Sequence, residues 1–264
     1  MIANRKQILH AGGCQVFTSQ ASLGEPVVVF VAGLGEDTST WQSVQPKAAQ
    51  FVHTFAYDRA GLSGSQLYHS NPKTVEQMAK ELHAVLNAAH LSPPYVLTGH
   101  SLGGAIVELY AHTYPRDVAG LVLVDPEDGR LLDQLQAKLP KDEWAAREKM
   151  LSQVMSGASP AQKAEIESSR ASGKALAAAF PLPDLPTVLL TGRLKDPSFP
   201  GNPLEQDLKL QAHDELLKAN PHVEHVLAPK SRHYIQEDAP QLGIDAIRKV
   251  VDECRAAASK AAAE

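Results

Sequence analysis

Residues 95–107 read YVLTGHSLGGAIV, in which an apolar run leads into Gly-His-Ser-Leu-Gly and then into a segment that favours a helix. A serine at a sharp strand-to-helix turn needs small residues two positions before and after it, because the tight backbone leaves no room for side chains there. Gly99 and Gly103 occupy those positions. The pattern predicts that Ser101 is a nucleophile, and a glycine-rich turn in which Ser101 only caps the helix is the alternative.

The turn also supplies a candidate group to stabilise negative charge. The backbone N–H of Leu102 follows the serine at the start of the expected helix. Unpaired N–H groups and the helix dipole favour a developing negative charge at this position. We therefore expect Leu102 to provide one half of an oxyanion hole.

A histidine that could serve as the base lies near the end of the chain. In the arrangement that this serine turn indicates, the chain order is serine, then acid, then histidine. His233 fits, because VEHVLAP (223–229) favours a strand and SRHYIQEDAP (231–240) a loop leading into the last helix. A surface histidine that caps a turn is the alternative interpretation. His100 adjoins the nucleophile but leaves the turn on another side, so we expect it to pack against a neighbouring strand or loop.

The chain resembles the α/β-hydrolase family over nearly its whole length, in its serine hydrolase and carboxylesterase-like branch. The segments that carry this likeness are PVVVFVAGLGEDTSTW (26–41), FVHTFAYDRAGLSGS (51–65), YVLTGHSLGG (95–104), VAGLVLVDPED (118–128), LPTVLLTGRLKDP (185–197) and SRHYIQEDAP (231–240). The resemblance implies that the backbone N–H of Leu34 is the second oxyanion donor. The chain departs from the family pattern at Ala32, where a histidine is usual. Dehalogenases and epoxide hydrolases of the family use an aspartate at the nucleophile position, so Ser101 argues against both.

The resemblance leaves two candidates for the acid. Asp196 follows the strand PTVLLTG, which is the commonest family position, but the loop spacing is offset by one residue. Asp125 ends the strand GLVLV, a position that some branches of the family use. Either residue could instead cap a turn. We favour Asp125 and keep Asp196 as the alternative.

Alternating strand and helix signals predict an α/β fold with a mostly parallel, doubly wound sheet. Two short antiparallel edge strands are expected within 7–19. Further strands are expected at 26–31, 52–57, 95–99, 119–124, 186–191 and 223–227. Helices are expected near 40–50, 73–90, 102–114, 205–219 and 239–257. Strand signals vanish between 128 and 183, where helix formers dominate, so we expect a helical cap at 128–183 on a core made of 1–127 and 184–264.

Composition excludes several classes of protein. The 264 residues are 44% hydrophobic and 21% charged, with a net charge of −5, which offers no basic surface for nucleic acid. Only Cys14 and Cys254 are present, so no disulfide framework is expected. No segment has the pattern of a signal peptide or a membrane span, and we expect a soluble cytoplasmic protein without a membrane partner.

These features predict acyl transfer by a Ser-His-Asp triad without cofactor or metal. Apolar residues in 128–183 favour a small-molecule substrate with a hydrophobic part, such as a carboxylic ester or lactone. Amide, thioester or carbon–carbon hydrolysis, a perhydrolase, a lyase and a ligand receptor on the same fold are the alternatives.

Overall fold

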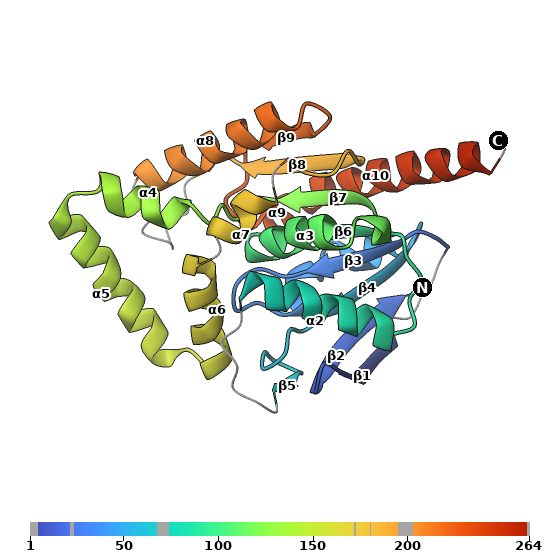
Figure 1. Ribbon diagram of the computed structural model, residues 1–264, viewed down its shortest axis with the longest axis horizontal. Coiled ribbons are helices and arrows are strands. Elements are labelled where there is room, and N and C mark those ends of the chain that lie inside the picture. The colour runs from blue at the N-terminus through green and yellow to red at the C-terminus, as the bar shows by residue number, and fades with distance from the viewer. Residues whose placement is uncertain are drawn as a thin grey trace.

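A computed structural model describes residues 5–21, 24–67, 74–171, 173–179, 181–194 and 203–262 (Figure 1). Within these ranges the chain forms one sheet of nine strands. The strands are β1 (Arg5–Ala11), β2 (Cys14–Ala21), β3 (Val27–Val31), β4 (His53–Tyr57), β5 (Gln66–Leu67), β6 (Tyr95–His100), β7 (Val118–Val124), β8 (Thr187–Gly192) and β9 (Glu224–Ala228). Their spatial order is β1-β2-β4-β3-β6-β7-β8-β9, with β5 paired to β2.

The sheet is parallel from β4 to β9 and antiparallel at the β1–β2 edge. The predicted α/β class and mostly parallel sheet are confirmed. The two predicted edge strands form a hairpin, in which Arg5 pairs with Gln20 and Ala11 with Cys14. The six other expected strands lie within one residue of their predicted ends. Three strands in the interior of the sheet, β3, β6 and β8, are buried along their whole length, as expected for strands covered on both faces.

Helices join most of these strands. The longer ones are α2 (Val75–Ala88), α3 (Leu102–Thr113), α4 (Leu131–Lys138), α5 (Lys141–Gly157), α6 (Pro160–Ala171), α8 (Pro203–Ala219) and α10 (Pro240–Ala261). The shorter ones are η1 (Thr38–Trp41), α1 (Gln45–Ala48), η2 (Pro115–Asp117), α7 (Gly173–Ala178) and α9 (Ile235–Asp238).

Two of the predicted helices differ from the structure. The helix expected over 40–50 is wrong, since this stretch contains η1 and α1 as separate turns. Pro46 lacks the N–H that a continuous helix would need, and it stands instead in the first turn of α1. The last helix extends to Ala261 rather than ending near 257.

The core has two halves, one on each face of the sheet. Alternate residues of β3 divide between them: Val27, Val29 and Val31 join the half covered by α2 and α3, whereas Val28 and Phe30 join the half covered by α10. This period of two is the expected behaviour of a strand buried on both sides.

The helices α4 to α7 follow β7 and precede β8, within the segment 128–183 where the sequence predicts helices. Figure 1 shows them beside the sheet, on the side to which the arrows of β3, β7 and β8 point. They therefore lie at the carboxyl edge of the parallel strands, where open α/β sheets bind their ligands.

Cys14 and Cys254 are both free and buried. No described helix is long and apolar enough to cross a membrane.

Backbone segments meet closely around the turn between β6 and α3. A Cβ atom added at Gly103 would lie 2.2 Å from the carbonyl oxygen of Val31. A Cβ atom added at Gly99 would lie 2.3 Å from the carbonyl oxygen of Gly103. Both obstacles are backbone atoms, so these positions require glycine for steric reasons, as the sequence pattern indicates.

We predict that Gly103→Ala lowers the free energy of unfolding by about 1–3 kcal/mol, the usual cost of overpacking, because the new methyl group would collide with β3. Gly157→Ala is the matched control, since no atom lies within 4 Å of its added Cβ. Urea denaturation of both variants checks this. Equal stability of the two proteins would contradict the close approach.

Candidate active site

Ser101 stands between β6 and α3 with φ 52° and ψ −119°, a left-handed conformation that is strained for a residue with a side chain. Hydrogen bonds to neighbouring backbone groups hold this conformation. The Ser101 N–H donates to the carbonyl of Val124 (3.1 Å), and the Ser101 carbonyl accepts from the N–H groups of Gly104 (2.8 Å) and Glu127 (3.1 Å). Ser101 occupies the N-cap position of α3, but its side chain makes no capping hydrogen bond to this helix.

His233 lies in the loop between β9 and α9, and its ring contacts Asp125. The distance from His233 Nδ1 to Asp125 Oδ2 is 2.7 Å. Asp125 directly follows β7 and has no exposed surface, whereas the His233 side chain is 36% exposed. A buried carboxylate on Nδ1 holds the imidazole in one orientation and leaves Nε2 available for proton transfer.

Two further groups donate to the Asp125 carboxylate. Lys209 Nζ, on α8, lies 2.7 Å from Oδ2 and 3.0 Å from Oδ1, and the Gly192 N–H donates to Oδ1 at 3.0 Å. Burial alone would raise the pKa of Asp125, but the His233 hydrogen bond and the charge of Lys209 outweigh burial and hold this pKa well below its ordinary value. Asp125 is therefore ionised at neutral pH.

Asp196, the alternative acid, lies outside the described residues. The structure thus brings together His233 and Asp125 and gives no position for Asp196. Lys209 did not emerge from the sequence, because its helix begins far from Asp125 in the chain and a lysine on a helix ordinarily faces solvent.

The loop that carries Leu34 is fixed by Arg59, which follows β4. Arg59 Nη1 donates to the carbonyl of Ala32 and Nη2 to the carbonyl of Gly33, each at 2.6 Å. The Arg59 guanidinium also pairs with Glu165 of α6, with Nε 2.7 Å from Oε1. Glu165 Oε2 in turn accepts from the Gly35 N–H at 2.8 Å. Both side chains of the Arg59–Glu165 pair are essentially fully buried, so each charge needs the other to offset the cost of its burial.

A second polar chain joins the same loop to the histidine. Glu36 Oε2 accepts from the Gly33 N–H at 2.9 Å and lies 3.1 Å from His100 Nδ1. His100 Nε2 lies 3.2 Å from the carbonyl oxygen of His233. His100 is fully buried and packs against neighbouring loops, as expected from its place beside Ser101. Its contacts connect the loop of Leu34 with the loop of His233.

The two expected oxyanion donors lie in the turn after Ser101 and in the loop after β3. Leu102 is the first residue of α3, where the N–H groups have no partner within the helix. Leu34 lies between Gly33 and Gly35, which are both held by the contacts described above. The described site therefore contains a serine at a strained turn and an imidazole on a buried carboxylate, and the two oxyanion donors stay predictions.

Comparison with known proteins agrees with this arrangement. A family model described as the alpha/beta hydrolase family matches residues 28–246. Protein YqjL of Bacillus subtilis (strain 168) is 36% identical over 118 residues, which are 44% of this chain and 46% of that protein. A protein named "Putative carbamate hydrolase RutD" from Cronobacter turicensis is 34% identical over 102 residues, which are 39% of this chain and 38% of that protein. The chain thus matches less than half the length of either relative.

A solved structure shows the same fold. It is a "putative lipase (lip1)" from Acinetobacter baumannii AYE, with a TM-score of 0.74 and 19% sequence identity. The likeness covers 96% of this chain and 92% of that one. At this level of identity the comparison establishes the fold rather than the reaction.

We predict that Glu165→Ala lowers the free energy of unfolding by about 3–5 kcal/mol, because it leaves the buried Arg59 guanidinium without its carboxylate. Glu253→Ala is the control, since it removes an exposed partner of Lys249 on α10 and should have a much smaller effect. Thermal and urea denaturation measure both. Equal small losses would show that the Arg59–Glu165 pair is not tightly coupled.

Proposed function

The chain belongs to the alpha/beta hydrolase family, and on that basis we propose that it is a serine hydrolase that cleaves a carboxylic ester or lactone through an acyl-enzyme. The observation that supports this most is the 2.7 Å contact of His233 with a buried Asp125, combined with the strained backbone of Ser101. An aspartate in place of Ser101 would have indicated the alkyl-enzyme chemistry of epoxide hydrolases or dehalogenases.

The proposed reaction has two steps. Ser101 Oγ attacks the carbonyl carbon while His233 Nε2 accepts the hydroxyl proton, and the N–H groups of Leu34 and Leu102 stabilise the oxyanion. The imidazolium returns this proton to the leaving alkoxide, which departs as an alcohol. His233 then takes a proton from water, the hydroxide attacks the acyl carbon, and the proton returns to Ser101 as the acid leaves. Asp125 remains ionised throughout and orients the imidazole.

We also propose that residues 128–183 act as a cap on a core formed by 1–127 and 184–264. Support comes from the contacts of α6, whose Glu165 binds both Arg59 and the Gly35 N–H beside Leu34. A hydrophobic part of the substrate would then lie under the apolar residues of this segment. The name of the relative from Cronobacter turicensis makes a carbamate, whose carbonyl carbon is also open to nucleophilic attack, a further substrate class to test.

Labelling with a fluorophosphonate probe tests the nucleophile. We predict that the wild-type protein is labelled and turns over p-nitrophenyl esters many times, whereas Ser101→Ala does neither and keeps its fold, because only a small hydroxyl is removed. Circular dichroism checks the fold of the variant. Labelling of another serine in Ser101→Ala would overturn the assignment, and a single turnover of the wild type would indicate a ligand receptor.

The acid is tested by comparing two amide variants. Asp125→Asn should lower turnover by about 10⁴-fold, because the amide favours the wrong imidazole tautomer, whereas Asp196→Asn should keep most of the activity. Steady-state kinetics on one ester measures the turnover of both variants. Panels of lactones and carbamates then compare the substrate classes. The reverse result, an inactive Asp196→Asn with an active Asp125→Asn, would make Asp196 the acid.

A further inference from the structure

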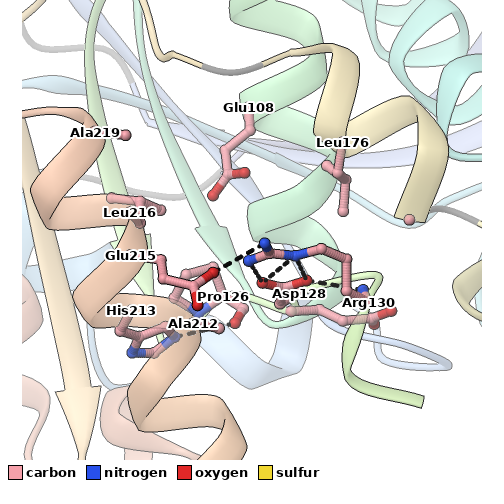
Figure 2. Close-up of a pocket in the computed structure, with 12 residues that line it drawn as sticks. Glu108, Pro126, Asp128, Arg130, Leu176, Ala212, His213, Glu215, Leu216 and Ala219 are labelled. Atoms are coloured by element: carbon pink, nitrogen blue, oxygen red, sulfur yellow. Dashed lines mark hydrogen bonds and ion pairs between the residues drawn. The ribbon is translucent and has the colours of Figure 1, made fainter. Parts of the chain in front are cut away.

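A cavity of about 300 Å³ lies between α3, α7, α8 and the segment that follows β7 (Figure 2). This volume is at the lower end of the range for small-molecule sites. Ser101, His233 and Asp125 are not among the residues that line it. Instead its wall combines carboxylates with aliphatic side chains, and none of these carboxylates has a role in the proposed reaction.

Glu108 of α3 is the unusual member of this wall. The residue is only 4% exposed, and Figure 2 shows its carboxylate directed into the cavity, with Leu176 on one side and Leu216 on the other. Among the described residues, no group forms a hydrogen bond or an ion pair with it. A buried carboxyl group without a partner is costly when ionised, so this position favours either a proton or a cationic ligand.

The other carboxylates of the cavity are already satisfied. Arg130 pairs with Asp128 and, at 2.9 Å, with Glu215, so one guanidinium serves both carboxylates. Glu127 accepts a hydrogen bond from the hydroxyl of Ser169. With Glu108 ionised, the wall would carry more negative than positive charge, and Glu108 is its carboxyl group without such a partner among the described residues.

His213, the other titratable residue of the wall, does not offset this charge. Its Nδ1 lies 2.8 Å from Thr191 Oγ1 and its Nε2 lies 3.3 Å from the carbonyl oxygen of Pro126. Burial, the largest influence, lowers the pKa of His213, so the ring is neutral at physiological pH. Both ring nitrogens are engaged and neither faces a ligand.

We propose that this cavity binds a small organic ammonium ion, with the N–H groups donating to Glu108 and the aliphatic part packed against Leu176 and Leu216. The ligand would supply the positive charge that an ionised Glu108 needs, and its short apolar chain would match the apolar side of the cavity. Burial and the nearby charge of Asp128 raise the pKa of Glu108 to about 8, so the empty site holds a proton at neutral pH. Binding of the ammonium ion therefore replaces this proton, which is released to solvent.

The site is distinct from the candidate active site yet adjoins it. The Glu127 N–H donates to the carbonyl oxygen of Ser101 at 3.1 Å, and Pro126 follows Asp125 directly. The proposal itself needs no catalysis, because it concerns binding alone. Direct binding measurements test it even if the chain proves to hydrolyse no ester.

Isothermal titration calorimetry with n-butylammonium on the full chain tests the proposal. We expect the wild-type protein to bind n-butylammonium, and n-butanol, which has the same chain without the charge, to bind at least tenfold more weakly. Glu108→Gln should weaken n-butylammonium binding at least tenfold, because the carboxylate is lost. Glu167→Gln, the same change at an exposed position of α6, should keep the affinity within twofold.

Proton release provides a second measurement that needs no variant. Titrations of the wild type at pH 6.5 in buffers of different ionisation enthalpy should show about one proton released per ligand bound, falling toward zero above pH 9. The proposal is overturned if n-butylammonium fails to bind at 50 mM, if n-butanol or Glu108→Gln binds equally well, or if binding at pH 6.5 releases no proton.

Discussion

The buried guanidinium of Arg59 is the group on which the geometry of the candidate site depends. It must be fully hydrogen-bonded to be tolerated in the core, and its partners are the carbonyls of Ala32 and Gly33 and the carboxylate of Glu165. These partners come from the loop after β3 and from α6. Because the buried guanidinium needs these hydrogen bonds and its ion pair, it fixes the backbone on either side of Leu34. The N–H of Leu34 is the proposed second oxyanion donor.

The polar chain from Glu36 through His100 extends this constraint to the loop of His233. Burial would raise the pKa of Glu36, but the hydrogen bonds from His100 and from the Gly33 N–H outweigh it, and the carboxylate stays ionised. Since His100 also contacts the carbonyl of His233, the loop after β3 and the loop after β9 share one set of buried hydrogen bonds. Displacement of either loop would leave buried polar groups of the other without partners.

Local patterns in the sequence account for much of this molecule. Runs of apolar residues predict the buried strands, and Gly99 and Gly103 predict the tight turn at Ser101. The structure has these strands and this turn where the sequence predicts them. Contacts between distant segments are different. Glu165 lies 106 residues from Arg59 in the chain. Nothing in the local sequence distinguishes either residue from an ordinary charged residue of a helix or loop, so their contact could not be predicted. The helix expected over 40–50 was wrong for a local reason, the effect of Pro46.

The position of Lys209 has a consequence for the behaviour of the molecule in acid. A carboxylate with a lowered pKa contributes stability at neutral pH, and this contribution is lost only as the pH falls below the range in which a free aspartate takes up its proton, near 3.9. Asp125 is such a group, so mild acidification would leave the link between β7, α8 and the His233 loop intact. The Asp125 carboxylate of the candidate site therefore also holds β7, α8 and the His233 loop together in mildly acidic solution.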